Sequence, residues 1–440
     1  MSQANTNRIS LWSAIIININ IIIGSGVFIN TTELAKRAGL LGGLCYALVG
    51  LLLFPLILSF VRLLQLYPSG GFYSFCSTSI NPFFGFINTW CYFFAKLSSA
   101  TLAIHIFTLL MQKTFPSLTF CSAATFDIGI LIMLLTLNML NMQTGSKIQG
   151  WLMILKLFPL FLVIIAGLLL LKGSNLTPVH QLWQGIPAAI PLVLHALLGF
   201  EVACAISRNL ENPEINGPRS ILISYGIVIT LYVLYQTFFY GILGTSLTQA
   251  TNYSGAFPLL IDTFGISDQF RNILGHFIHL AIATSALSAG FGMIYANIWN
   301  LYSLAERKLT IIPQIITQHN RFNVPFVCVL IEGAIMLIYM LIINGEQTTF
   351  QQLSAFGTTV TYVISIIGLL ATLHQHHHSL LLPIMGLINC LILMSVSLFT
   401  MWKTNNPVPL YIFIAIVISG IITYKISPKS LQNNDKQSYD

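Results

Sequence analysis

The chain alternates between long apolar segments and short polar stretches from Leu11 to Lys425. A helix needs about 20 apolar residues to cross the hydrocarbon core of a membrane. The segments that we assign as spans cover residues 10–38, 40–66, 83–112, 124–142, 147–172, 185–209, 219–243, 270–304, 324–344, 348–373, 379–401 and 408–425. This pattern predicts an all-α integral membrane protein with about twelve transmembrane helices.

Composition and charge support this prediction. Of the 440 residues, 55% are hydrophobic and 7% are charged, whereas soluble domains carry about 25% charged residues. Lys and Arg are more frequent on the side of the membrane that holds both termini, so residues 1–9 and 426–440 are expected in the cytoplasm. We therefore expect a multi-pass protein of the plasma (inner) membrane, surrounded by lipid. The excess of Lys and Arg on the cytoplasmic side accounts for the formal net charge of +7. We therefore expect no nucleic-acid partner.

The residue types that build metal sites and catalytic centres are dispersed. The seven cysteines are scattered, mostly within spans, and no CxxC pair is present. We therefore expect no structural disulfide, no metal and no cofactor. No nucleophile–base pair lies in the spans, which argues against an enzyme.

The first apolar segment is interrupted at Gly24-Ser25-Gly26, between Ile23 and Val27. Glycine costs about 1 kcal/mol per residue in a helix interior, and a backbone group freed inside a membrane must find another partner. An unwound segment here presents amides at the start of a second half-helix, which suits a carboxylate. Small residues at this spacing also occur where helices pack closely, so packing is the alternative to binding.

A second interruption is predicted within the span 185–209, where Gly199 precedes Glu201. Carbonyl groups freed between Ala196 and Gly199, that of Leu198 included, could accept hydrogen bonds from an ammonium group. Together the two interruptions would bind a zwitterion through the backbone, which implies an α-amino acid.

Interruptions at corresponding positions of two halves are typical of transporters built from inverted repeats, which bind substrate near the midplane. We predict a ten-helix transport core over 10–373, with repeat one at about 10–172 and repeat two at about 185–373. Two further helices, over 379–425, would lie outside the repeats.

Four ionisable residues within the spans are candidate functional groups, because such residues are costly in a membrane. We interpret Glu201 as a group for proton coupling or gating, with a protonated acid at a helix contact as the alternative. Lys156 joins this set, although its ammonium could instead snorkel toward the cytoplasm. Lys96 lies mid-span, where it could pair with Glu201 or face the cavity. His195, one turn before the second interruption, is a candidate binding residue.

Several segments together resemble the amino acid–polyamine–organocation (APC) family of transporters. They are IIGSGVF (22–28), YPSGGFYSF (67–75), GFINTWCYF (85–93), GFE followed by LENPEINGPRSI (199–221), and RFNVP (321–325). The resemblance implies the five-plus-five inverted-repeat (LeuT-like) fold of that superfamily, with broken helices 1 and 6.

The resemblance also implies roles for individual residues. Gly24, Ser25 and Gly26 match the family segment that binds the substrate carboxylate, and 196–199 matches the segment that binds the amino group. Glu201 matches an acid linked to proton-dependent gating. Lys156 fits a lysine of sodium-independent members, whose ammonium stands where sodium-coupled relatives hold sodium. His195 departs from the family, in which this position usually holds a gating aromatic residue.

The expected function is secondary active transport of an amino acid or related amine by alternating access. The resemblance favours a sodium-independent mechanism, either proton-coupled symport or substrate exchange. A membrane sensor that binds amino acids without transporting them is the alternative. The sequence leaves open the identity of the amino acid and the oligomeric state.

Overall fold

The computed structural model describes residues 8–68, 70–140, 142–177, 184–250, 253–403 and 406–428. The predicted N-terminal segment 1–9 and tail 426–440 therefore fall mostly outside the described residues. Within these ranges the regular elements are helices, joined by one isolated β-bridge between Ile9 and Leu210. The all-α prediction is confirmed.

The elements follow the predicted spans. The α-helices are α1 (Leu11–Ile22), α2 (Gly26–Ala38), α3 (Gly42–Leu66), α4 (Gly71–Ser77), α5 (Pro82–Thr114), α6 (Ala123–Asn138), α7 (Met142–Leu170), α8 (Ile186–Leu197), α9 (Val202–Ile206), α10 (Pro213–Leu243), α11 (Ser246–Gln249), α12 (Tyr253–Asp262), α13 (Asp268–Glu306), α14 (Pro313–Ile316), α15 (Phe326–Ile343), α16 (Gln347–Gln375), α17 (Leu381–Lys403) and α18 (Val408–Lys425). The 3₁₀ helices include η1 (Gly39–Leu41), η2 (Pro116–Phe120), η3 (Gly173–Leu176) and η5 (Ser207–Asn209).

Within the described part of the chain, nine helical stretches are long and apolar enough to cross a membrane. One of them joins α2 to α3 through η1. The helices α1 and α6 are apolar but shorter. The first predicted span is therefore two half-helices, α1 and α2, and the sixth is α8 and α9. Whether the two halves of the core form an inverted repeat stays a prediction.

Local sequence sets several helix starts. Ser10 caps α1, since its hydroxyl accepts a hydrogen bond from the Ser13 amide at 3.3 Å. Asn81 caps α5 in the same way, with 3.0 Å between its Oδ1 and the Phe84 amide, and Pro82 follows at the first helical position. Both arrangements satisfy amides that the first turn leaves without a helical acceptor.

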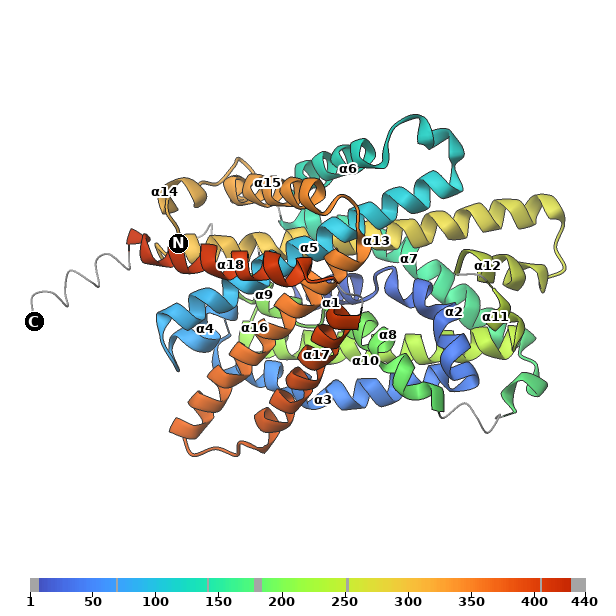
Figure 1. Cartoon of the computed structure of the whole chain (residues 1–440), viewed down its shortest axis with the longest axis horizontal. Helices are drawn as coiled ribbons and strands as arrows, with labels where there is room; N and C mark the ends of the chain where they lie inside the picture. The colour runs from blue at the N-terminus through green and yellow to red at the C-terminus, as the bar shows by residue number, and fades with distance from the viewer. Residues whose placement is uncertain are drawn as a thin grey trace, which may run out of the picture.

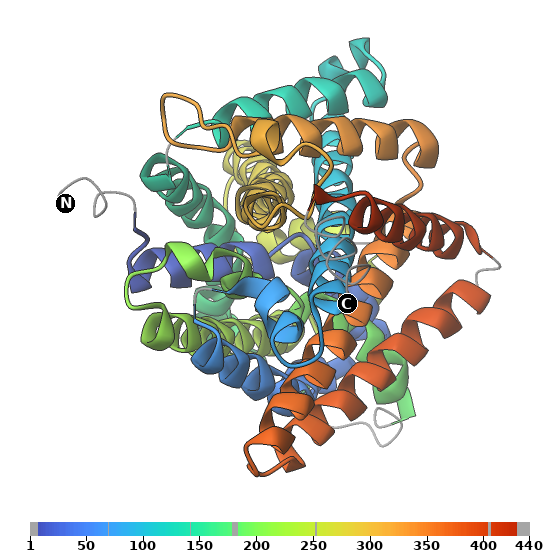
Figure 2. The same ribbon diagram turned by 90° about the vertical axis from the view of Figure 1, so that its left-hand side faces the viewer.

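The long helices α5 and α13 run side by side through the centre of the molecule, and the other elements surround them (Figures 1 and 2). Helices α1, α3, α7 and α10 pack together on one side, and α16 and α17 form a hairpin whose helices contact α5 and α3. Helices α6 and α15 lie together at the periphery. Large apolar side chains such as Leu51, Trp151 and Leu341 are exposed at the outer surface, as expected for helices that face lipid.

Glycine permits the closest helix contacts. A Cβ on Gly290 of α13 would lie 3.1 Å from the Cβ of Ala103 in α5. A Cβ on Gly368 of α16 would lie only 2.2 Å from the Phe75 carbonyl oxygen of α4. Because backbone oxygen cannot rotate away, α16 approaches α4 this closely only with glycine at 368.

We expect Gly368→Ala to destabilise the protein by about 1–3 kcal/mol through overpacking. Thermal unfolding of the purified protein in detergent would show a lower midpoint. The matched control is Gly226→Ala in α10, where a Cβ would meet nothing within 4 Å. This control should leave the midpoint unchanged or raise it, because alanine favours a helix more than glycine does. Equal effects of the two substitutions would contradict the proposed contact.

Candidate substrate site

Two helix interruptions meet inside the molecule, at the positions predicted from the sequence. Residues 23–25 separate α1 from α2, and 198–201 separate α8 from α9. Gly199 has φ +114°, a conformation that only glycine adopts without strain. A Cβ at Gly199 would lie 3.4 Å from the Cα of Ile22. The two unwound segments are therefore in close contact.

Lys156 of α7 holds the end of α1 in place. Its side chain is 0% exposed, and its Nζ donates hydrogen bonds to the carbonyl oxygens of Asn20 at 2.6 Å and Ile23 at 2.5 Å. The last carbonyl groups of a helix have no N–H donor within that helix. Inside a membrane each of them needs another hydrogen-bond partner. The lysine supplies these partners, so its position is buried and not the snorkelling position considered from the sequence.

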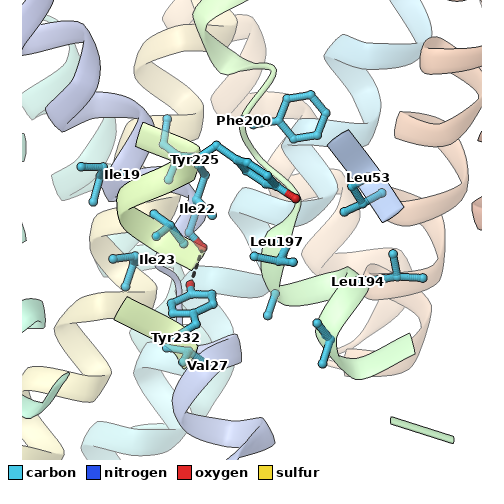
Figure 3. Packing of buried hydrophobic residues seen from close by; sticks show 14 of the residues in the cluster. Ile19, Ile22, Ile23, Val27, Leu53, Leu194, Leu197, Phe200, Tyr225 and Tyr232 are labelled. Atoms are coloured by element: carbon cyan, nitrogen blue, oxygen red, sulfur yellow. Dashed lines mark hydrogen bonds between the residues drawn. The ribbon is translucent and has the colours of Figure 1, made fainter. Parts of the chain in front are cut away.

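Two further side chains complete this hydrogen bonding. Tyr232 of α10 donates from its hydroxyl to the Ile22 carbonyl oxygen at 3.2 Å (Figure 3). Ser285 of α13 donates to the Gly24 carbonyl oxygen at 3.1 Å. The unwound backbone of the first interruption is thus supported from α7, α10 and α13.

The first amides of α2 lack an acceptor within their own helix. Gly26 and Val27 begin α2, so their N–H groups have no carbonyl of the same helix to bind. Figure 3 shows the apolar side chains around the two interruptions, among them Ile22, Ile23 and Val27 beside the first and Leu197 and Phe200 beside the second. Ile23 and Val27 are 0% exposed. These two residues were predicted to bind substrate, but they pack behind the cavity and are not among the residues that line it.

A cavity of about 120 Å³ lies where the interruptions meet. Its walls come from α1, α2, α5, α8, α13 and α16 and from the two unwound segments. The lining residues that the sequence predicted are Gly24, Ser25, Gly26, Lys96, Ala196, Leu198 and Gly199. The side chain of His195 lies outside the described part of the structure, so its predicted role stays untested.

Glu201 lies behind the cavity wall and pairs with Lys96. The Lys96 Nζ is 2.5 Å from Glu201 Oε1, and the Gly199 amide donates to Glu201 Oε2 at 3.0 Å. Tyr92 donates its hydroxyl to Oε1 at 3.4 Å. Glu201 is 0% exposed, whereas Lys96 lines the cavity. The pairing considered from the sequence is present, and the lysine stands between the acid and the cavity.

A polar wall on α5 and α16 was missed from the sequence except for Lys96. It consists of Lys96 and Ser99 on α5 and Gln351, Ser354 and Thr358 on α16. Ser99 and Ser354 share a hydrogen bond of 2.6 Å between their hydroxyl oxygens. The spacings 96/99 and 351/354/358 place each set on one helix face, so a search for polar residues at helical spacing would have found them.

The helix ends near Arg208 are joined by one ion pair and one cation–π contact. Arg208 of η5 donates to Glu306 at the end of α13 at 2.7 and 3.1 Å. Arg307 lies 4.7 Å from the ring centroid of Tyr73 in α4. These contacts join α4, η5 and α13 at the end of the molecule that the charge distribution assigns to the cytoplasm.

The chain belongs to the amino acid permease family, whose pattern it matches over residues 9–424. An uncharacterized transporter of Mycobacterium bovis is 25% identical over 402 residues, which cover 88% of this chain and 85% of the relative. The lysine-specific permease LysP of Lactococcus lactis is 23% identical over 368 residues, with 77% and 70% covered. The aromatic amino acid transport protein AroP of Escherichia coli is 23% identical over 365 residues, with 78% and 75% covered.

These matches confirm the resemblance to the APC family. The chain is a multi-pass membrane protein of a family of amino acid transporters. Because LysP and AroP are named for different kinds of amino acid, membership alone leaves the substrate to be inferred from the cavity.

We expect Lys156→Met to destabilise the site, because it removes the side-chain donor to the Asn20 carbonyl oxygen and leaves the Ile23 carbonyl oxygen only the weaker contact with Ser285 Oγ, at 3.4 Å. Each unsatisfied buried group costs about 1–3 kcal/mol. The thermal unfolding midpoint in detergent should fall. Lys172→Met is the matched control, since Lys172 is exposed just beyond the end of α7. A midpoint unchanged in Lys156→Met would show that these carbonyls need no ammonium.

Proposed function

We propose that this protein is a secondary active transporter that moves an amino acid or related amine across the membrane by alternating access. The observation that carries the proposal is the cavity at the meeting point of the two helix interruptions. One interruption brings the backbone of Ser25 and Gly26, at the start of α2, to the cavity wall, and amides at a helix start suit a carboxylate. The other presents the last carbonyls of α8, at Ala196 to Leu198, which suit an ammonium group. An α-amino acid carries both groups.

We further propose that transport is sodium-independent. The ammonium of Lys156 already donates hydrogen bonds to the carbonyl oxygens of Asn20 and Ile23. These are oxygen ligands of the type that cations bind, so a fixed cation takes the place that a sodium ion would fill.

Glu201 is the proposed group for proton coupling. It touches the Gly199 amide at the second interruption and Lys96 at the cavity wall. A change in its protonation would therefore alter both the backbone and the cavity. Exchange of one substrate for another is the second form of transport that this arrangement permits.

In the proposed alternating-access cycle, the contacts between Arg208 and Glu306 would close one end of the transport path. The side chains of this bidentate pair are 29% and 41% exposed. Exposed ion pairs contribute about 0–1 kcal/mol, so the pair can break during each cycle without a large barrier.

The decisive test is uptake by proteoliposomes with a panel of labelled amino acids. Uptake is measured with and without a pH gradient, with and without sodium, and with unlabelled amino acid preloaded inside. We expect the protein to take up at least one amino acid. Sodium should not stimulate this uptake, whereas a pH gradient or internal substrate should accelerate it. Binding of an amino acid without uptake would instead identify a sensor.

Substitution of Glu201→Gln tests proton coupling. Glutamine is similar in size and keeps one acceptor oxygen, but it cannot take up a proton, so we expect the variant to lose stimulation by a pH gradient and to retain exchange. Glu214→Gln, an exposed acid in the first turn of α10, is the control and should behave as the unmodified protein. Stimulation by a pH gradient that survives in Glu201→Gln would exclude Glu201 as the coupling group.

A further inference from the structure

We propose that the substrate is an amino acid with an acidic side chain, whose carboxylate binds to Lys96 and the neighbouring polar residues of α5 and α16. This inference rests on the proposed function, because it assumes that the interruptions bind the α-amino and α-carboxylate groups. It adds a separate subsite for the side chain, made of Lys96, Ser99, Gln351, Ser354 and Thr358.

The first observation is the position of Lys96. The lysine lies within a membrane span, where a charged residue is costly. Its side chain is 6% exposed and that residual surface faces the cavity. An ammonium has three N–H donors, and Glu201 Oε1 at 2.5 Å accounts for one of them. A pair that served only to join two helices would not need its cation at the cavity wall.

The second observation is a polar group that has no partner. Thr358 is 1% exposed and lines the cavity. Its hydroxyl oxygen makes no hydrogen bond within the described part of the chain. A buried hydroxyl without a partner costs free energy, and a substrate carboxylate would accept its hydrogen bond. Ser99 and Ser354, which share one hydrogen bond, offer a further hydroxyl donor.

The charge of Lys96 distinguishes between acidic and basic substrate side chains. A lysine or arginine substrate would place a cation beside the Lys96 ammonium, with Glu201 shielded behind it. A carboxylate would instead meet a cation and hydroxyl donors. Charge-assisted hydrogen bonds of this kind are about twice as strong as neutral ones.

The acidic substrate also brings one negative charge that the Lys96–Glu201 pair must balance. A proton from solution that bonds to Glu201 Oε1 removes the negative charge of that carboxyl. The Lys96 ammonium is then left to neutralise the substrate carboxylate, and the proton leaves Glu201 after the substrate departs. The titratable groups that face Glu201 are Lys96 and Tyr92 from α5, Cys204 from α9 and Tyr362 from α16.

The size of the cavity agrees with a short side chain. Its volume is about 120 Å³, and Met293 and several alanines of α5 and α13 close the apolar side. Pockets for drug-sized ligands measure about 300–1,000 Å³. Aspartate and glutamate are therefore the substrates that we expect.

The test measures binding of labelled L-glutamate and L-aspartate to the purified full-length protein, with unlabelled amino acids as competitors. Glutamate and aspartate should compete best, the uncharged glutamine and asparagine at least about tenfold less well, and lysine and arginine least. Competition by glutamine equal to that by glutamate, or stronger competition by lysine, would overturn the proposal.

Variants locate the effect at Lys96. Lys96→Met should weaken glutamate binding about tenfold to a hundredfold. Because this change leaves Glu201 buried without a cation, the double variant Lys96→Met with Glu201→Gln serves as the folded, uncharged version. It should lose glutamate binding while small neutral amino acids still bind. Lys425→Met, an exposed lysine at the end of α18, is the control. Unchanged glutamate binding in the double variant would overturn the proposal.

Failure of this inference is distinguishable from failure of the proposed function. Glutamate binding without uptake in proteoliposomes would support the acidic subsite and contradict transport. Uptake of neutral or basic amino acids without glutamate competition would support transport and overturn the acidic subsite. Absence of binding by any amino acid would overturn both.

Discussion

The requirement that a broken backbone inside a membrane must find hydrogen-bond partners governs the centre of this protein. A continuous helix satisfies its own carbonyls and amides, and an interrupted one leaves several of them unpaired. At the end of α1, the carbonyls are satisfied by Lys156, Tyr232 and Ser285. The helices α7, α10 and α13 are thereby tied to the interruption. The proposed substrate site lies beside this hydrogen bonding, where the cavity meets the backbone of Ser25 and Gly26 and the hydroxyl of Thr358, which is unpaired among the described residues.

The ammonium groups of the two buried lysines are stabilised by different kinds of partner. Lys156 is stabilised by backbone carbonyls, and its charge is part of the scaffold. Lys96 is stabilised by a carboxylate that can take up a proton. The first arrangement is fixed, because carbonyls cannot titrate. The second can change its net charge, and it is the one that borders the cavity. Lys156 therefore supports the backbone of the interruption, and Lys96 belongs to a pair whose net charge can change.

Sequence reasoning located the interruptions well because they break a strong local rule. Glycines at 24, 26 and 199 contradict the helical preference of the apolar segments around them, and the structure interrupts the helices there. Gly199 accounts in the same way for the unwound residues 198–201 that precede the short helix α9. Tertiary partners were harder to predict. Nothing local indicates that Tyr232 reaches the Ile22 carbonyl, since 210 residues separate the two. The polar wall on α16 was missed because threonine and serine are common in membrane helices, where they bond their own backbone. Thr359 and Thr361 do so, to Ala355 and Gly357, whereas Thr358 does not.

Glu201 connects the features that the proposed alternating-access cycle would couple. Its two oxygens bind different parts of the site: Oε2 accepts from the Gly199 amide and Oε1 from Lys96. Gly199 in turn contacts the end of α1, which Lys156 holds. A proton on Glu201 weakens the attraction to Lys96 and removes an acceptor at one oxygen. The effect therefore reaches the second interruption through Gly199 and the cavity through Lys96 at the same time. A ligand shifts a conformational equilibrium only through a difference in its interactions between states. In the proposed mechanism substrate and proton act on the same two residues, so each would change the affinity of the protein for the other by an equal factor.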